Sequence, residues 1–149
     1  MKVFIAADHA GFDSKNSLIT ELEKKYIIHD MGPYELDPND DYPIYAKKVS
    51  LAVKENPGSM GILICKSGEG MAIAANKIKG IRAVTVDSVE QAEETRQDND
   101  SNVLSLSSKE LSLREMNEIS NAWLNTKFSG LERHQRRIDE ISELEKDML

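Results

Sequence analysis

Short apolar runs alternate along this chain with longer segments in which apolar residues recur every three or four positions. Continuous apolar runs bounded by glycine, proline or polar residues are typical of strands buried on both faces of a sheet. They predict strands at 3–7, 26–31, 60–65, 81–86 and 102–106. The helical spacing predicts helices at 12–25, 42–54, 71–79, 88–97, 108–125 and 132–148.

This alternation predicts an α/β fold with a five-stranded parallel sheet and helices on both faces, because parallel neighbours need crossover connections. We expect residues 1–149 to form a single domain. The last predicted helix has no strand after it, and Ile138, Ile141 and Leu144 form an apolar stripe along it. We therefore expect that helix to pack on a partner subunit in a homo-oligomer.

Composition narrows the class of protein. The chain has 149 residues, of which 40% are hydrophobic and 30% charged, as in ordinary globular domains. A net charge of −7 disfavours nucleic acid as a partner. The single cysteine excludes an internal disulfide and a paired-cysteine metal site. We find no signal-type segment and no apolar run that could span a membrane, and we expect a cytoplasmic enzyme.

Ligands of parallel sheets bind where the strands end, and polar residues follow several of the predicted strands. The segment 65–70, Cys-Lys-Ser-Gly-Glu-Gly, connects a strand to a helix. Its glycines let backbone N–H groups converge on an anion or an oxyanion, although a plain structural turn is an equal alternative. It matches neither a phosphate-binding P-loop nor a dinucleotide-binding motif. No cluster has metal-ligand spacing, so we expect neither metal nor cofactor.

Cys65 ends its strand beside this turn, where a thiolate would be stabilised. A buried, inert cysteine is the alternative. A thiolate next to an oxyanion site suits acyl transfer or proton abstraction next to a carbonyl.

Two further groups of residues suggest a phosphorylated, polyhydroxylated substrate. Asp8 and His9 follow the first strand and could bind a sugar, or Asp8 could cap the next helix. Arg133 and Arg137 lie one helical turn apart and could hold a phosphate together. The alternative for these arginines is a solvated face that pairs with neighbouring acidic residues.

Several segments resemble the ribose-5-phosphate isomerase B family, which includes the galactose-6-phosphate isomerase subunits. They are AADHAGF (6–12), DYPIYAKKV (41–49), GILIC-x-SGEGMAIAANKIKGIRAV (61–84), NDSNVL (99–104) and RHQRRI (133–138). The resemblance implies a Rossmann-like three-layer sandwich, a dimer or dimer of dimers, and an active site at the subunit interface. It also implies interconversion of an aldose and a ketose phosphate through a cis-enediolate.

The resemblance assigns roles to residues of this chain. Cys65 would be the base, and Ser67 would act with the 68–70 amides on the enediolate oxygen. Some relatives use a glutamate six positions after the cysteine position, but Met71 stands there. With the loop, we expect a substrate site of Asp8, His9, Tyr42, Lys66, Gly68, Glu69, Gly70 and Asn99. We expect His9, Lys109, Arg133 and Arg137 to hold the phosphate.

Three positions depart from the family pattern. Asp98 replaces a histidine that helps to open the sugar ring, and an ionised carboxylate cannot donate a proton as imidazolium does. Lys66 replaces a glycine in the loop. Lys109 replaces a phosphate-binding arginine that comes from the neighbouring subunit, and it lacks the bidentate geometry of arginine.

These departures leave alternatives to a ribose 5-phosphate isomerase. The same chemistry could act on a tetrose 4-phosphate such as erythrose 4-phosphate, which cannot close a furanose ring, or on allose or galactose 6-phosphate. A non-catalytic sugar-phosphate-binding subunit is a third hypothesis. A cysteine acyltransferase is a fourth, but no base lies near Cys65 in the sequence.

Overall fold

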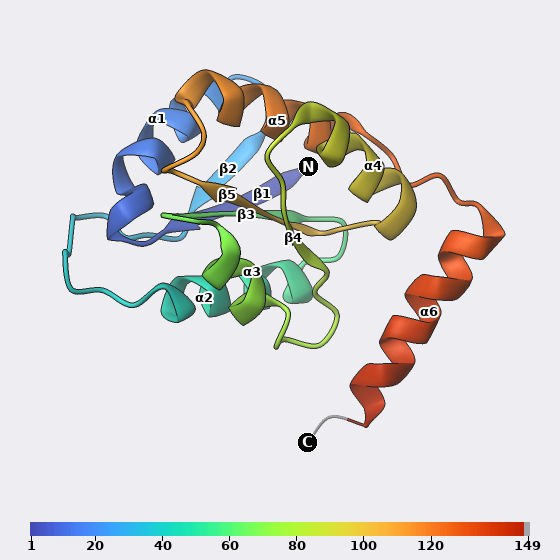
Figure 1. The fold of residues 1–149 in the computed structure, drawn as a ribbon. Helices are drawn as coiled ribbons and strands as arrows, with labels where there is room; N and C mark the ends of the chain where they lie inside the picture. The colour runs from blue at the N-terminus through green and yellow to red at the C-terminus, as the bar shows by residue number, and fades with distance from the viewer. Residues whose placement is uncertain (148–149) are drawn as a thin grey trace.

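The computed structural model describes residues 1–147, which form a parallel sheet between two layers of helices (Figure 1). The strands are β1 (Lys2–Ala7), β2 (Ile27–Asp30), β3 (Met60–Cys65), β4 (Ala83–Thr85) and β5 (Val103–Ser107), in the order β2-β1-β3-β5-β4. The helices are the short 3-10 helix η1 (His9–Gly11) and α1 (Phe12–Leu22), α2 (Tyr42–Glu55), α3 (Glu69–Ala75), α4 (Val89–Asn99), α5 (Leu113–Asn125) and α6 (Glu132–Lys146).

Alternate residues of the central strands fill two hydrophobic cores. Val3 and Ile5 of β1 pack with the helices α1, α4 and α5, which cover one face of the sheet (Figure 1). Phe4 of β1 and Leu63 of β3 pack with α2 and α3 on the other face. All six residues of β3 are buried, as a strand covered on both faces requires. The predicted Rossmann-like three-layer sandwich with five parallel strands is confirmed.

Several predicted boundaries are wrong, and local hydrogen bonding explains the largest error. The helix expected to begin at residue 108 begins at Leu113, because the Ser112 side chain accepts from the Glu115 backbone and the Glu115 side chain accepts in return. Helix α3 spans 69–75 rather than 71–79, and β4 covers only three residues. The predicted end of the last helix, Met148, lies outside the described residues.

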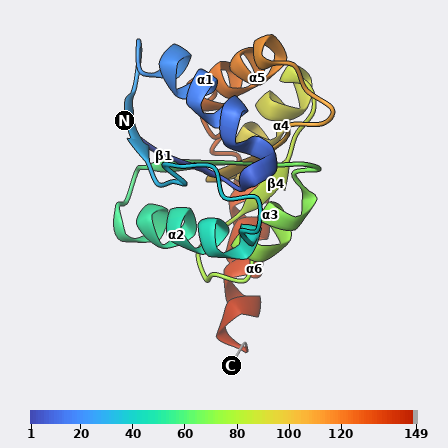
Figure 2. The same cartoon turned by 90° about the vertical axis from the view of Figure 1, so that its left-hand side faces the viewer.

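The α6 helix stands apart from the two helical layers (Figures 1 and 2). His134 and Ile138 on its inner side are buried, while Ile141 and Leu144 further along are 41% and 67% exposed. The apolar stripe predicted on this helix is therefore only partly covered within one chain. None of the helices in residues 1–147 combines the length and the apolar character needed to cross a membrane.

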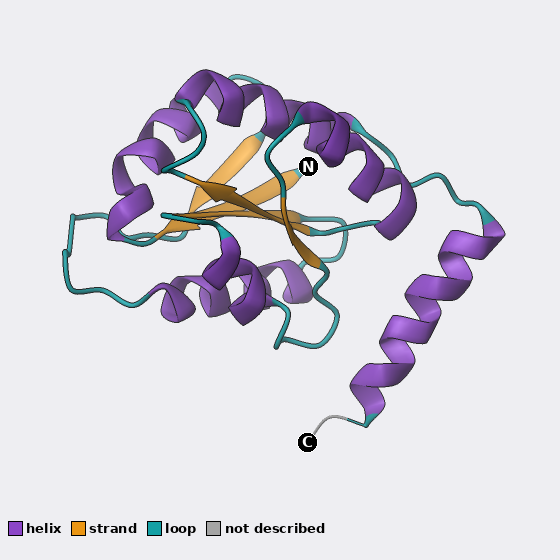
Figure 3. Ribbon diagram, viewed as in Figure 1, coloured by secondary structure: helices purple, strands orange, loops and turns teal. Residues whose placement is uncertain are grey.

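The loop that joins β2 to α2, residues 31–41, runs past the edge where the strands end (Figure 3). Each central strand runs toward this edge, and the helices that follow carry the chain back. Asp8, Tyr42 and the 65–70 loop therefore meet at one edge, because all three stand at the junction between a strand and the next helix.

Candidate active site

A pocket of about 330 Å³ lies at this edge, between the end of β3 and the beginnings of α2 and α3. Eight residues line it: Asp8, Tyr42, Cys65, Lys66, Ser67, Glu69, Gly70 and Ile73. Seven of them are site residues predicted from the sequence, and they come from three separate segments. The sheet order explains their meeting, because β1 and β3 are hydrogen-bonded neighbours.

Backbone geometry at Gly68 closes the 65–70 loop around Cys65. Gly68 has a left-handed φ of +78°, which glycine adopts without strain. A Cβ there would lie 3.1 Å from the carbonyl carbon of Leu106. The Gly68 carbonyl accepts hydrogen bonds from the side chains of Thr85 and Ser105. The turn is thus tied to both β4 and β5.

Cys65 is the last residue of β3, and its side chain belongs to the core that faces α2 and α3. Only 4% of Cys65 is exposed, yet it lines the pocket. Its sulfur accepts the backbone N–H of Gly68 at 3.2 Å. This hydrogen bond holds the sulfur beside the backbone of the 65–70 loop. The cysteine is buried, as the alternative hypothesis held, but it remains open to a molecule in the pocket.

Tyr42 forms the wall opposite the loop. An added Cβ on Gly70 would lie only 2.6 Å from the Cε1 of Tyr42, so the ring sits directly against the glycine. Tyr42 is the first residue of α2, and 39% of it remains exposed. A side chain at position 70 would therefore displace this ring.

Asp8 caps the helix that follows it and also lines the pocket. One carboxylate oxygen, Oδ1, accepts the backbone N–H groups of Ala10 and Gly11 at 3.0 and 3.2 Å and caps η1. The same residue lines the pocket. Capping fixes the carboxylate at the pocket wall, so the structural role also positions the group for binding.

His9, beside Asp8, is held by a residue that sequence reasoning missed. Asp40 Oδ1 lies 2.8 Å from His9 Nδ1 and also accepts the His9 backbone N–H at 3.0 Å. The side-chain hydrogen bond to Asp40 raises the pKa of His9, and the nearby charge of Asp8 adds to this effect. His9 is not among the residues that line the pocket, and 43% of its side chain is exposed.

Lys109 follows β5, and its backbone N–H donates to the Lys66 carbonyl at 3.1 Å. The structure thus places Lys109 beside the 65–70 loop of its own chain, at the edge that carries Cys65. Lys66 and Lys109 are both exposed there. In an acidic protein, the two lysines supply positive charge next to the pocket.

Four predicted site residues lie elsewhere in the chain. Asp98 and Asn99 belong to the last turn of α4, which has run back to the edge where the strands begin. Arg133 and Arg137 are exposed on α6, beyond that edge (Figure 1). The α4–β5 loop does not fold back toward Cys65, so one chain does not bring these four residues to the pocket.

Among these distant residues, Asp98 contacts α6. His134 Nε2 of α6 lies 3.4 Å from the carboxylate of Asp98. Arg136 pairs with Glu132 at 3.5 Å and lies 4.0 Å from Glu140. Within residues 1–147 we find no ion pair for Arg133 or Arg137. Arg133 and Arg137 are exposed, as the solvated-face alternative requires, but among the described residues the acidic pairing is made by Arg136.

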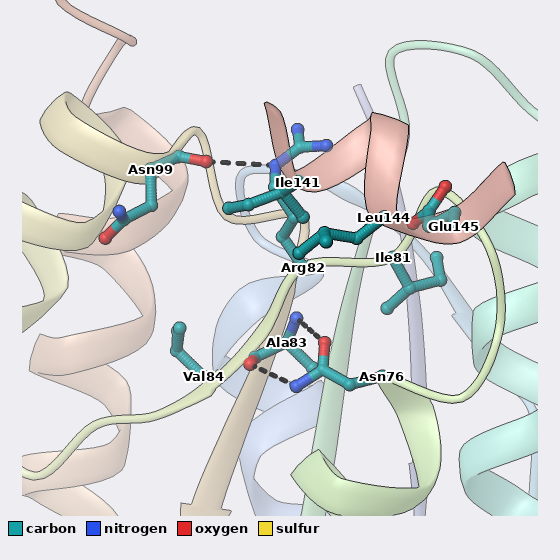
Figure 4. Close-up of a pocket in the computed structure, with 9 residues that line it drawn as sticks. All are labelled: Asn76, Ile81, Arg82, Ala83, Val84, Asn99, Ile141, Leu144 and Glu145. Atoms are coloured by element: carbon teal, nitrogen blue, oxygen red, sulfur yellow. Dashed lines mark hydrogen bonds between the residues drawn. The ribbon is translucent and has the colours of Figure 1, made fainter. Parts of the chain in front are cut away.

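A larger hollow of about 450 Å³ lies between α6 and β4, away from the cysteine (Figure 4). The Asn76 side chain pairs with both backbone groups of Ala83, and Arg82 Nε donates to the carbonyl of Asn99. Ile141 and Leu144 of α6 form its outer wall. Its polar side chains are engaged in hydrogen bonds: Glu145 accepts from the Gly80 backbone, and Arg82 also donates to the Asp100 carbonyl.

Sequence reasoning also missed Ile73 among the pocket residues. Met71, Ala72 and Ala75 are the buried residues of α3, while Ile73 is 64% exposed. The helical period could have revealed this outward position. Asp40 gives no such signal, because it is 31 residues away from His9 in the sequence.

Comparison with known proteins agrees with this arrangement. The family model described as Ribose/Galactose Isomerase matches residues 3–141. A probable ribose-5-phosphate isomerase B of Mycoplasma pneumoniae is 42% identical, over 97% of this chain and 95% of its own length. The ribose-5-phosphate isomerase B of Escherichia coli is 39% identical, over 97% and 96% of the two chains.

Two solved structures extend the comparison to the fold. Ribose-5-phosphate isomerase B of Mycoplasma genitalium, with bound ribulose-5-phosphate, superposes with a TM-score of 0.94 at 42% identity, over 99% of this chain and 97% of that one. The Clostridium thermocellum protein gives a TM-score of 0.95 at 37% identity over the whole of both chains. The chain therefore belongs to the Ribose/Galactose Isomerase family.

Proposed function

We propose that this protein interconverts D-ribose 5-phosphate and D-ribulose 5-phosphate, with Cys65 as the base. The observation that carries the proposal is the pocket in which a buried thiol, the Ser67 side chain and the backbone of the 65–70 loop meet. Family membership gives the class of reaction, isomerisation of a sugar phosphate. The relative crystallised with ribulose-5-phosphate supports the choice of a pentose phosphate.

The proposed reaction starts from the open-chain aldose. The Cys65 thiolate removes the proton from C2, the C–H electron pair forms the C1–C2 double bond, and the carbonyl electrons move onto O1. Ser67 and the amides of 68–70 stabilise the resulting enediolate oxygen. The proton on O2 passes to O1, the O2 electrons form the C2 carbonyl, and the electron pair of the C1–C2 double bond takes the proton back from Cys65 at C1, which gives the ketose. No redox partner is needed, because the electrons stay within the substrate.

We place the complete site between two subunits. Arg133, Arg137 and Asn99 cannot reach the pocket of their own chain, but a second copy could bring them there. Two exposed apolar surfaces support this arrangement: Ile73 beside the pocket is 64% exposed, and Leu144 on α6 is 67% exposed. Isolated exposed apolar residues are ordinary, but these two lie next to the groups that must be joined.

Turnover by the purified protein tests the function directly. We would offer ribose 5-phosphate, erythrose 4-phosphate, allose 6-phosphate and galactose 6-phosphate, with EDTA present. Fast conversion of ribose 5-phosphate would support the proposal. Conversion confined to a tetrose or hexose phosphate would keep the chemistry and change the substrate. No turnover with any of them would refute the proposal.

The role of Cys65 has its own test. Cys65→Ala should lower kcat by about 10²–10⁴-fold, the usual contribution of a positioned base, and leave substrate binding intact. The chain has 1 cysteine, so inactivation of the wild type by iodoacetamide reports on Cys65 alone. Ribose 5-phosphate should protect against this inactivation. Near-normal kcat in Cys65→Ala would remove the cysteine from the mechanism.

Mixing Cys65→Ala, which lacks the proposed base, with Arg137→Ala, which should bind the substrate weakly, tests the shared site. We would unfold and refold Cys65→Ala together with Arg137→Ala and assay at low substrate concentration. In a symmetric dimer, half of the molecules would be mixed and each would have one intact site, which gives about a quarter of wild-type activity. If both groups act within one chain, mixing restores nothing.

A further inference from the structure

We infer that Asp40 is a positioning residue that holds His9 as an imidazolium, with its Nε2–H free to donate to the phosphate of the substrate. This inference rests on the proposed function for the identity of the ligand. The contact itself is made by Asp40, which directly precedes the 41–49 segment quoted for the resemblance.

The geometry fixes the orientation of the His9 ring and places a carboxylate against one of its nitrogens. One oxygen of Asp40, Oδ1, accepts from the His9 backbone at 3.0 Å and lies 2.8 Å from Nδ1. Two bonds to one acceptor hold the backbone and the ring together. Since Nδ1 takes the proton that faces the carboxylate, Nε2 must carry a second proton for the ring to be charged. Within residues 1–147 no hydrogen bond to Nε2 is found.

The side chain of Asp40 is buried and His9 is its hydrogen-bond partner. Its side chain is 4% exposed, while that of His9 is 43% exposed. The second carboxylate oxygen, Oδ2, is buried and finds no hydrogen-bond partner within the described residues. A buried carboxylate that lacks other partners depends on a cation for stabilisation, and His9 is the group in contact with it.

The other charged groups that act on His9 have the same sign. Asp8, on the segment that joins β1 to η1, and Asp37, in the 31–41 loop, both raise the pKa of His9. Neither α1 nor β3, which also pack against η1, contributes a group that shifts this pKa. The acidic surroundings therefore favour the charged form of the ring and raise the pKa of His9.

A direct test is the NMR titration of His9 in the wild-type protein, with its signal assigned by comparison with His9→Gln. We expect a pKa above the ordinary value of about 6.5 and a lower one in Asp40→Asn. Asparagine can still accept from both nitrogens, so this variant removes charge and keeps shape. A wild-type pKa at or below 6.5 would overturn the inference without any variant.

Anion binding provides a second test that needs no turnover. We would use inorganic sulfate as the probe, because its charge is constant in this range. At pH 7.5, Asp40→Asn should bind sulfate about tenfold more weakly, as expected for loss of one charge-assisted hydrogen bond. If Asp40 acted only through its own negative charge, its removal would strengthen sulfate binding. The positioning role and simple charge repulsion therefore predict opposite changes in sulfate affinity.

Asp37→Asn is the matched control. It makes the same change of charge in the same loop without touching the His9 ring, and it should leave sulfate binding unchanged or slightly stronger. The raised pKa means that the cation is present at low pH and is lost as the pH rises through that pKa. At about pH 5.5 His9 should be charged in both the wild type and Asp40→Asn, so the sulfate affinities of the two proteins should converge. Equal weakening by Asp37→Asn and Asp40→Asn would overturn the inference.

The kinetic readout separates this inference from the proposed function. If the wild type isomerises ribose 5-phosphate, Asp40→Asn should raise KM at pH 7.5 and leave kcat nearly unchanged. A fall in kcat at constant KM would contradict a phosphate-binding role for His9. If the wild type turns over no sugar phosphate, the proposed function fails, while the NMR and sulfate results still decide whether Asp40 charges His9.

Discussion

Replacing Gly70 by alanine tests whether the Tyr42 ring sets the shape of the pocket. The new Cβ would lie 2.6 Å from Cε1 and 2.7 Å from Cζ of Tyr42. Ordinary carbon contacts are about 3.5–4.0 Å, so the ring must move by about 1 Å. Because 39% of Tyr42 is exposed, the ring can swing outward without disturbing the core.

The expected result is a loss of activity without a loss of stability. Alanine is favoured over glycine in a helix by about 0.5–1 kcal/mol, which offsets part of the cost of moving the ring. The free energy of unfolding should therefore change by less than about 1 kcal/mol. A displacement of 1 Å in a pocket wall lowers kcat/KM by up to about 100-fold. Urea denaturation and steady-state kinetics on one preparation measure both quantities.

A double-mutant cycle with Tyr42→Ala identifies the cause. If the alanine acts by pushing the ring, Gly70→Ala should add little once the ring is absent. Full activity of Gly70→Ala, or an equal loss in both backgrounds, would refute the reasoning. The second outcome would mean that the new methyl group itself fills the pocket.

Two further predictions use matched pairs. Gly68→Ala should destabilise the fold by about 2–3 kcal/mol, against about 1 kcal/mol for Gly80→Ala, in urea denaturation. Both glycines have positive φ, but only Gly68 faces nearby backbone. Arg137→Ala should raise KM about tenfold at unchanged kcat, whereas Arg136→Ala, which loses only exposed ion pairs, should change KM less than about twofold. Equal destabilisation in the glycine pair would contradict the crowding at Gly68, and equal changes of KM in the arginine pair would contradict phosphate binding by Arg137.

The strands and the site loop could be predicted because their signals are local. An apolar run such as 60–65 can satisfy its side chains only inside a sheet covered on both faces. Its end therefore also places Cys65 and the loop after it. The boundaries near Leu113 and Ala83 were predicted less well, because helix caps and sheet pairing decide them and the apolar pattern does not.

The charged and polar contacts could not be predicted in the same way. Lys15 is fully buried, and its Nζ bonds Asp30 at 2.9 Å, although a lysine in a helix is normally read as a solvated residue. Asp40 reaches His9 across 31 residues of sequence. The first contact depends on the packing of α1 against β2, and the second on the path of the 31–41 loop past η1.

The sequence by itself determined the parallel sheet, the junctions where Asp8 and Cys65 stand, and the family pattern. It did so because apolar periodicity and turn residues act over a few neighbouring positions. Only the tertiary structure decided which candidates meet. It gathers the 65–70 loop with Tyr42 and leaves Arg137 on a helix beyond the opposite edge. The crossovers place the candidates at different edges of the sheet. Residues at the ends of strands lie at the pocket, whereas residues at the ends of helices lie at the edge where the strands begin.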